Sequence, residues 1–294
     1  MQGLILLNKP AGVTSFGAVA RVRRIFGEKR AGHTGTLDPM ATGVLPILLG
    51  RATRLSGYLL EADKRYTADV LPGVVTDTLD ITGKVVDQRA VSLSRDPIER
   101  ALCAFRGEIE QVPPMYSALK KDGQRLYDLA RRGVEVERER RRVNIKKLEL
   151  VEITAEGHWI LDVVCSKGTY IRTLADDLGR ALGCGATLAG LCRTETAGFA
   201  LSECVSLEEL PRDPAGHLLP VERCLGHLAK VAVTEKQASR FANGGELSLD
   251  RLPPLAGGDG PLRVYGPDGA LLGLGDVREE ALKVVCLLTE EDVR

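Results

Sequence analysis

The chain has 294 residues, of which 44% are hydrophobic and 27% are charged, and 40 basic side chains balance 40 acidic ones. This length allows about two domains, and the composition is that of a globular protein. No apolar run approaches the roughly 20 residues that span a bilayer, and residues 1–10 lack the charged start and long apolar centre of a signal peptide. We therefore expect a cytoplasmic protein without membrane contact.

Cysteine and histidine spacing argues against a metal site and against a disulfide framework. The seven cysteines are odd in number, and no two of them are spaced as C-x-x-C. The four histidines show no H-x-x-x-H pattern of the kind that holds zinc. We expect no metal, and we expect most cysteines to be small buried hydrophobes in a reducing cytosol.

Charge is distributed unevenly between the two halves of the chain. Residues 1–150 hold 26 lysines and arginines against 18 acids, a net charge of +8, whereas residues 151–294 hold 14 against 22, a net charge of −8. Such asymmetry favours a basic face that meets a polyanion. One basic cluster alone is more typical of a solvated surface, but three clusters in one half make nucleic acid a candidate partner. They are Arg21, Arg23, Arg24, Lys29 and Arg30; Lys120, Lys121, Arg125, Arg131 and Arg132; and Arg138, Arg140, Arg141, Arg142, Lys146 and Lys147.

The first 60 residues predict a strand, a helix, a loop and a second short helix. Residues 1–10 are typical of a strand that ends in a turn. Thr14 or Ser15 can cap a helix with apolar positions 19, 22 and 26 on one face, and Gly27 is placed to end it. Apolar residues at 52, 55 and 59 predict the second helix.

The loop between these helices, Gly32 to Leu45, surrounds one carboxylate with three glycines and three threonines. Glycine lets a backbone come close to a ligand, and Pro39 favours an extended or turn conformation at Asp38. One interpretation is a stiff loop that presents a single carboxylate. The other is a helix N-cap at Asp38 with Pro39 in the first helical position, and composition alone favours this second interpretation.

The middle of the chain predicts strands and helices in mixed order. We expect strands at 66–75, interrupted by Pro72-Gly73, and at 143–153, 159–165 and 188–194. Asp96-Pro97 is typical of a helix start, and a further helix is expected from about Gln124 to Arg132.

The segment Ser166–Arg172 joins a strand to a helix that Thr169 can cap. Lys167 and the first amides of that helix can face an anion. Arg172 lies in the first turn, where the helix dipole disfavours a cation. We therefore expect Arg172 to have a specific anionic partner, either Asp38 or a phosphate, and an ordinary surface arginine is the alternative.

The pattern changes after about residue 220. Short strand-like pieces occur near 228–233, 263–265, 271–275 and 282–288, separated by a helix around 236–241 and by glycine- and proline-containing turns. This pattern predicts a small β-barrel.

Taken in order, the motifs of the chain resemble those of the bacterial tRNA pseudouridine-55 synthases, the B-type or TruB family of pseudouridine synthases. The resemblance covers roughly residues 3–200, and the tail is similar to the small RNA-binding PUA barrel that many members carry. The motifs are Asn8-Lys9-Pro10-x-Gly12-x-Thr14-Ser15; Gly32 to Gly43; Tyr66 with Thr76-Asp77-Thr78 and Asp80; Pro113-Pro114-x-Tyr116-Ser117-Ala118-Leu119-Lys120; Ser166–Arg172; and Leu191-x-Arg193-Thr194 with Gly198 and Phe199.

The resemblance implies an α+β fold. Residues 1–225 are expected to form a pseudouridine synthase catalytic domain with a mixed, mostly antiparallel sheet and flanking helices, and residues 226–294 a PUA-like RNA-binding β-barrel. The implied reaction breaks the glycosidic C–N bond of uridine 55 in the T-loop of tRNA, turns the uracil and joins its C5 to the ribose. It uses no cofactor and no metal. The expected partner is tRNA, through its T-loop and T-stem, and we expect a monomer.

By the same resemblance, Asp38 is the catalytic carboxylate and Arg172 is the cation that keeps it ionised. Whether Asp38 attacks the ribose, attacks the base or removes a sugar proton stays open. Tyr66 matches the residue that stacks on the flipped uracil and can help to move the C5 proton. Ordinary packing of a strand tyrosine is the alternative for Tyr66.

Four further residues are expected near the substrate. His33 is expected to hold the loop or the extruded base, with a purely structural role as the alternative. Leu191 is expected in the apolar wall of the pocket, or as a plain core leucine. Lys9 and Lys167 are expected to make phosphate or structural contacts.

Two positions depart from the family pattern. Pro72 stands where leucine is usual, so the strand there can bend differently. Cys192 stands where arginine is usual, which removes one positive charge and can weaken a phosphate contact. Neither position touches the expected chemistry.

Other functions stay open at this point. One is a related pseudouridine synthase acting on another RNA, and a second is a non-catalytic RNA-binding or tRNA-folding protein, which would not depend on Asp38. A hydrolase with a single aspartate nucleophile would need a second acid or base, for which the sequence has no matching motif.

Overall fold

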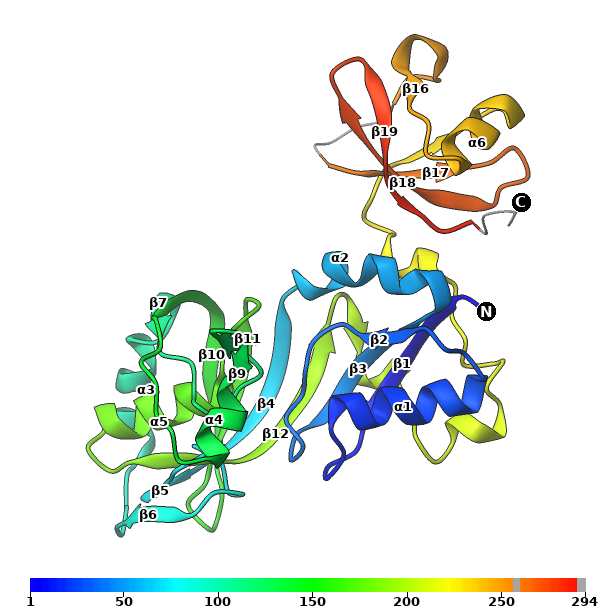
Figure 1. Ribbon diagram of the computed structural model, residues 1–294. Coiled ribbons are helices and arrows are strands. Elements are labelled where there is room, and N and C mark those ends of the chain that lie inside the picture. The colour runs from blue at the N-terminus through cyan, green and yellow to red at the C-terminus, as the bar shows by residue number, and fades with distance from the viewer. Residues whose placement is uncertain (256–259, 290–294) are drawn as a thin grey trace.

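A computed structural model describes residues 1–255 and 260–289 of the chain. Helices flank one large sheet, and a smaller curled sheet lies beyond one end of it (Figure 1). None of the described helices is long and apolar enough to cross a membrane.

The large sheet is mixed but mostly antiparallel, as predicted. Its strands follow the order β14-β1-β3-β12-β4-β11-β10-β7, with β2 beside β3 and β13 beside β12. Only the pairs β1–β14 and β3–β12 are parallel among its described strands. Its strands are β1 (Gly3–Lys9), β2 (Ala31–His33), β3 (Thr42–Leu49), β4 (Lys64–Pro72), β7 (Gly107–Gln111), β10 (Arg141–Ile153), β11 (Trp159–Cys165), β12 (Ala186–Thr196), β13 (Phe199–Ala200) and β14 (Val205–Ser206).

Strand β12 connects the parts of the sheet that carry the predicted site. It runs parallel to β3, with Cys192 opposite Thr42, and antiparallel to β4, with Arg193 opposite Tyr66. Strands β1 and β3 are buried along nearly their whole length and read as continuous apolar runs, as expected for strands covered on both faces. The loop that holds Asp38 connects β2 to β3, beside these buried strands.

The first predicted helix is confirmed together with both of its ends. Thr14 caps α1 by accepting a hydrogen bond from the Gly17 amide at 2.9 Å, and Gly27 ends it in the left-handed conformation at φ 63°. The helices are α1 (Ser15–Phe26), α2 (Ser56–Leu60), α3 (Arg95–Cys103), α4 (Leu126–Arg131), α5 (Ile171–Ala181) and α6 (Glu235–Ala242), with 3₁₀ turns at Gly50–Leu55, Leu201–Glu203, Leu210–Arg212, Val221–Cys224 and Leu249–Arg251.

Of the two interpretations of Asp38, the helix N-cap is wrong. Pro39 and Met40 form a turn, closed by a 3.1 Å hydrogen bond from the Ala41 amide to the Asp38 carbonyl, and β3 begins at Thr42. Pairing of β3 with β1 and β12 takes the chain into a strand before a helix can form. The carboxylate of Asp38 is therefore not used as a cap.

Three other helix starts differ from the prediction. Helix α3 follows Ser94, two residues before the expected cap at Asp96. Helix α4 starts at Leu126 because β9 (Gln124–Arg125) pairs with β8 (Lys120–Lys121). Helix α5 begins after Tyr170 rather than Thr169, whose hydroxyl donates to the Ser166 carbonyl at 2.9 Å.

The smaller sheet has the order β15-β17-β18-β19-β16, close to the strands predicted for the tail. It shares an apolar cluster with the large sheet, in which Leu4 and Leu6 of β1 join Leu271 and Leu274 of β18. Its strands are β15 (Lys230–Ala232), β16 (Leu247–Ser248), β17 (Leu262–Tyr265), β18 (Leu271–Arg278) and β19 (Ala281–Leu287), and a separate hairpin pairs β5 (Val74–Thr76) with β6 (Val85–Gln88).

The two departures from the family pattern lie within the sheet. Pro72 is the last residue of β4, opposite Ala186, and Gly73 turns the chain at φ 80° before β5. Proline lacks the N–H that a strand donates to its neighbour, and at the end of β4 this loss disturbs the sheet less than it would inside the strand. Cys192 is half-buried and lies in the middle of β12.

Gly43 lies where the backbone of β3 comes close to that of β12. Its φ is +104°, and a Cβ atom there would lie 2.2 Å from the Arg193 carbonyl oxygen. We expect Gly43→Ala to lower the free energy of unfolding by at least about 3 kcal/mol in urea titrations, because backbone strain and a backbone clash add. Gly157→Ala is the matched control, since φ is +88° and nothing lies within 4 Å of the new Cβ. It should cost about 1 kcal/mol, and equal losses in the two variants would contradict the close approach.

Candidate active site

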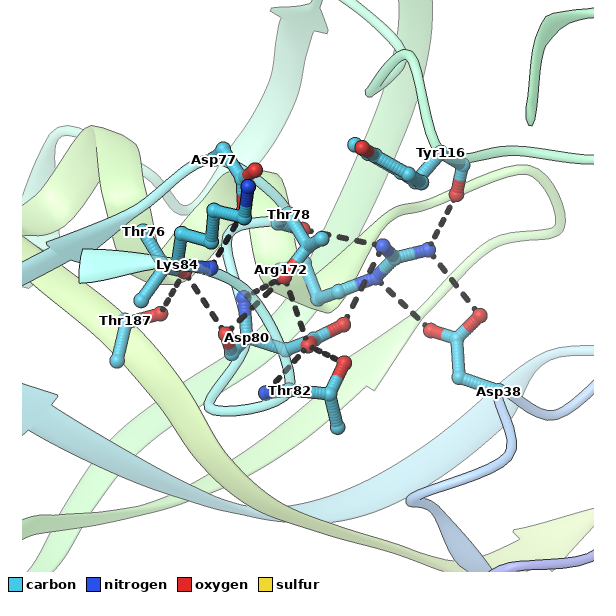
Figure 2. Close-up of polar contacts among 10 residues, drawn as sticks. All are labelled: Asp38, Thr76, Asp77, Thr78, Asp80, Thr82, Lys84, Tyr116, Arg172 and Thr187. Atoms are coloured by element: carbon cyan, nitrogen blue, oxygen red, sulfur yellow. Dashed lines mark hydrogen bonds and ion pairs between the residues drawn. The ribbon is translucent and has the colours of Figure 1, made fainter. Parts of the chain in front are cut away.

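Arg172 is the centre of the candidate site. It is the second residue of α5, and its side chain is 5% exposed. Of the partners expected for it, the structure has Asp38. The guanidinium Nε lies 2.9 Å from Asp38 Oδ2 and Nη2 lies 3.1 Å from Oδ1, so the two planar groups form a two-pronged ion pair (Figure 2).

The remaining N–H groups of Arg172 hold other segments of the chain. Nη1 donates to the Thr78 carbonyl at 3.1 Å and lies 3.4 Å from Asp80 Oδ2, and Nη2 also donates to the Tyr116 carbonyl at 2.8 Å. These contacts, with the two to Asp38, can occupy all five donors of a guanidinium. The plane of Arg172 is thereby fixed, in a way that the single ammonium of lysine could not reproduce.

Asp80 is a site residue to which the sequence analysis assigned no role. Its side chain is 6% exposed, and its Oδ1 accepts hydrogen bonds from the Thr78 hydroxyl at 2.9 Å, from the Thr82 amide at 3.0 Å and from the Thr82 hydroxyl. Oδ2 is left to face Arg172 (Figure 2). The signal in the sequence was the alternation of threonine and aspartate at 76–82, a pattern that builds side-chain turns.

Burial and three charged neighbours set the ionisation of Asp38. Its side chain is 32% exposed. Burial raises the pKa of the Asp38 carboxyl, the Arg172 guanidinium opposes that rise, and the nearby Asp80 carboxylate adds to it; Lys9 opposes it more weakly. The result is a carboxylate that is held in one orientation but is more basic than one in water.

Lys9 supports the loop rather than facing solvent. It is fully buried, and its ammonium donates to the carbonyls of Pro10 at 2.8 Å, Val13 at 2.7 Å and Pro39 at 3.3 Å. Burial lowers the pKa of Lys9 to about 8, with Asp38 opposing the shift. Of the two roles expected for Lys9, the structure supports the structural one, because a fully buried ammonium cannot reach a phosphate.

Arg193 is a second support that the sequence analysis named only as part of a motif. It is 1% exposed on β12, and it donates to the Val44 carbonyl at 2.7 Å and to the Gly35 carbonyl at 3.1 Å. Ser15 holds the other side of the loop, since its hydroxyl accepts from the Leu37 amide at 2.8 Å and donates to the Leu37 carbonyl at 3.0 Å. No pattern in a single sequence distinguishes a buried arginine from an exposed one on a strand.

Tyr66 and Leu191 join the apolar side of the site. Tyr66 is 8% exposed on β4 and belongs to the same cluster as Leu37, the neighbour of Asp38, and Leu191 of β12 is half-buried against that cluster. Burial raises the pKa of the Tyr66 hydroxyl, and Arg193 opposes the rise. Tyr66 is therefore protonated at neutral pH, and the strand register brings it beside Arg193.

His33 lies near the loop, whereas Lys167 pairs elsewhere. His33 ends β2, and its Nδ1 accepts from the Gly35 amide at 3.3 Å. Burial, with Arg193 nearby, lowers the pKa of His33, so its ring is neutral and its remaining proton is on Nε2. Lys167 has a 57% exposed side chain and forms an ion pair with Glu61. The structure thus groups Asp38, Arg172, Lys9, Tyr66, Leu191 and His33 around one loop.

Metal-ligating side chains do not converge anywhere in residues 1–255 and 260–289, where no group of three or more His, Cys, Asp or Glu could hold an ion. All seven cysteines fall within these residues, and each carries a free thiol.

Comparison with known proteins assigns the family. The model of the TruB family pseudouridylate synthase N-terminal domain matches residues 23–171, and that of the tRNA pseudouridylate synthase B C-terminal domain matches residues 172–225. The chain belongs to the TruB family. It is 48% identical to the tRNA pseudouridine synthase B of Azoarcus sp. over 96% of this chain and 93% of that protein, and 42% identical to the enzyme of Clostridium acetobutylicum over 98% and 100%.

Solved structures of related proteins have the same fold. A chain of a Cbf5-Nop10-Gar1 complex matches 98% of this chain and 85% of its own length with a TM-score of 0.75 and 27% identity. A chain of an H/ACA RNP bound to a substrate RNA containing 2'-deoxyuridine matches with a TM-score of 0.74 and 25% identity, over 99% of this chain and 86% of its own. The predicted fold class, a pseudouridine synthase core followed by a small PUA-like β module, is confirmed.

The electrostatic account of Asp38 predicts opposite effects of its two charged neighbours. We expect Asp80→Asn to lower the pKa of the Asp38 carboxyl, because a repelling carboxylate is removed, and Arg172→Gln to raise it. The titration can be followed by the carboxyl ¹³C resonance of Asp38. Asp96→Asn, an exposed carboxylate of α3, is the control and should leave that titration unchanged. Shifts of the same sign in the two site variants would contradict the arrangement.

Proposed function

We propose that this protein isomerises uridine 55 in the T-loop of tRNA to pseudouridine, with Asp38 as the catalytic carboxylate. The observation that carries the proposal is the two-pronged ion pair of Asp38 with the buried Arg172, whose guanidinium also contacts Thr78, Asp80 and Tyr116. Family membership and relatives named tRNA pseudouridine synthase B support the reaction and the substrate.

The chemistry requires an ionised carboxylate close to the reacting sugar and base. The bond between uracil N1 and ribose C1′ breaks, the ring turns, and C5 bonds to C1′; C5 loses its proton and N1 gains one, so the product is an isomer of the substrate. Arg172 keeps Asp38 ionised and fixes the orientation of its carboxylate. The Asp38 side chain is still 32% exposed, which leaves room for a reacting group. A partly desolvated carboxylate is a stronger nucleophile and base than one in water.

The other residues of the site would receive the extruded base. Extrusion costs a few kcal/mol, and stacking on an aromatic ring returns roughly 1–3 kcal/mol. We assign Tyr66 to stacking and to transfer of the C5 proton: its oxygen accepts that proton as the hydroxyl passes its own proton toward the uracil, where N1 gains one. Leu191 supplies an apolar wall beside it. His33, neutral and with its proton on Nε2, can donate to the RNA at the edge of the loop.

The RNA partner is supported by charge as well as by family. Residues 1–150 carry a net charge of +8, in which the Asp38 loop is embedded. We assign residues 226–294 to RNA binding, in line with their PUA-like sheet. A related reaction on another RNA is the alternative, favoured by the likeness to the H/ACA RNP chain, and mapping of the modified position distinguishes the two.

Asp38→Asn tests the catalytic assignment. We expect pseudouridine formation on an unmodified tRNA transcript to fall below about 0.1% of the wild-type rate, about 4 kcal/mol of barrier, while tRNA affinity changes by less than about threefold. The two side chains are nearly isosteric, so only the charge is lost. Chemical mapping of pseudouridine gives the rate and its position. Asp96→Asn is the control and should convert tRNA at the wild-type rate. Conversion of tRNA by Asp38→Asn would contradict the assignment of Asp38 as the catalytic carboxylate.

Salt dependence tests the polyanion assignment. The logarithm of the tRNA association constant should fall linearly with the logarithm of salt concentration, with a slope of about −0.7 to −0.9 for each phosphate contacted. Fluorescence anisotropy of labelled tRNA between low and physiological salt measures this slope. An affinity that does not change with salt would mean that the basic clusters are only solvated surfaces.

A further inference from the structure

Phe16 is unusually exposed for an aromatic side chain. It has 74% of its surface accessible, the highest fraction among the exposed large hydrophobic residues of the described chain. It lies in the first turn of α1, whose Val19 and Val22 are buried against the large sheet. An exposed phenylalanine gains nothing from burial in the core, and its ring is accessible to a partner.

Arginines continue the surface that Phe16 begins. Phe16, Ala20, Arg23 and Arg24 are spaced i, i+4, i+7 and i+8, which places them on one side of the helix, and all four are exposed. We name these four residues the α1 outer face. No acidic residue occurs in α1, and neither arginine forms an ion pair within the described part of the chain. The face is therefore aromatic at one end and cationic at the other.

The α1 outer face is fixed relative to Asp38. Ser15, the neighbour of Phe16, exchanges two hydrogen bonds with the backbone of Leu37, the neighbour of Asp38. The Gly12 amide also donates to the Pro39 carbonyl at 2.8 Å. Figure 1 shows α1 beside β1 and β3, in front of the large sheet. The first turn of α1 therefore lies next to the loop that holds Asp38.

We infer that the α1 outer face binds the RNA next to the target uridine. Phe16 stacks on an unpaired base other than that uridine, and Arg23 and Arg24 contact phosphates. An aromatic ring followed by cations without acids matches single-stranded RNA, which offers bases with π-faces and a charged backbone. A protein interface of this kind would need a wider apolar patch, whereas Phe16 is joined here by alanine and arginines. This inference rests on the proposed function for its RNA substrate.

The test compares tRNA affinity among full-length variants at fixed salt. Phe16→Ala should bind an unmodified tRNA transcript about tenfold more weakly, which corresponds to about 1.4 kcal/mol, and Phe16→Trp should retain affinity. The double substitution Arg23→Gln with Arg24→Gln should make the salt slope shallower by about 1 to 2. The unfolding midpoints should not change, because these side chains are exposed.

Matched controls come from exposed residues elsewhere on the surface. Arg100→Gln on α3 removes an exposed cation, and Val151→Ala on β10 removes an apolar side chain that is 58% exposed. Both should bind tRNA as the wild type does. Equal affinity of Phe16→Ala and the wild type, or a matching loss in the controls, would overturn the inference.

Two further results separate this inference from the proposed function. Conversion of tRNA by the wild type, with no effect of Phe16 on affinity, overturns the RNA surface and leaves the function standing. Absence of conversion, with Phe16-dependent binding, overturns the function and supports the surface. The last measurement is sedimentation of the protein without RNA. If the wild type is a dimer and Phe16→Ala is a monomer, the α1 outer face binds a second copy of the chain, and RNA binding by this face is overturned.

Discussion

The arrangement of the site depends on one buried guanidinium. Arg172 contacts Asp38, the segment at 78–80 and the carbonyl of Tyr116, which are distant in sequence and come from three different loops (Figure 2). Removing one partner of a buried ion pair leaves the other charge uncompensated, which costs several kcal/mol. The loops are thus held to one another through Arg172, and their positions cannot change independently.

Three other buried cations, Lys9, Lys64 and Arg193, lie on the strands of the site, and Lys9 is the one that acts on Asp38. Lys9 donates to the carbonyls of Pro10, Val13 and Pro39, and Arg193 donates to two carbonyls of the loop. Lys64 donates to the carbonyls of Leu60 and Ala62. Carbonyl dipoles replace the lost hydration of these cations but leave their net charge in place. Arg172 and Lys9 therefore oppose the rise in the pKa of Asp38 before any substrate arrives.

Local patterns predicted the elements that local forces determine. Helix α1 has both its caps and its apolar face in the sequence, and strands β10 and β11 alternate clearly, so these elements lie close to where they were expected. No helix begins at Asp38, because β3 pairs with β1 and with the sequence-distant β12. This pairing overrides the capping signal of Asp38-Pro39. The burial of Lys9 and the role of Asp80 also depend on tertiary contacts. The motif therefore predicted that Lys9 lies near the site but not that its ammonium is buried.

The shared apolar cluster between the two sheets has a consequence for the order of folding. Leu4 and Leu6 precede Leu271 and Leu274 of β18 by about 270 residues, yet the four side chains belong to one buried cluster. Translation proceeds at about 5–20 residues per second, so the cluster stays incomplete for many seconds after β1 has been made. During that interval an apolar edge of the nascent chain is open to water and to chaperones. Completion of this cluster therefore cannot precede the synthesis of β18.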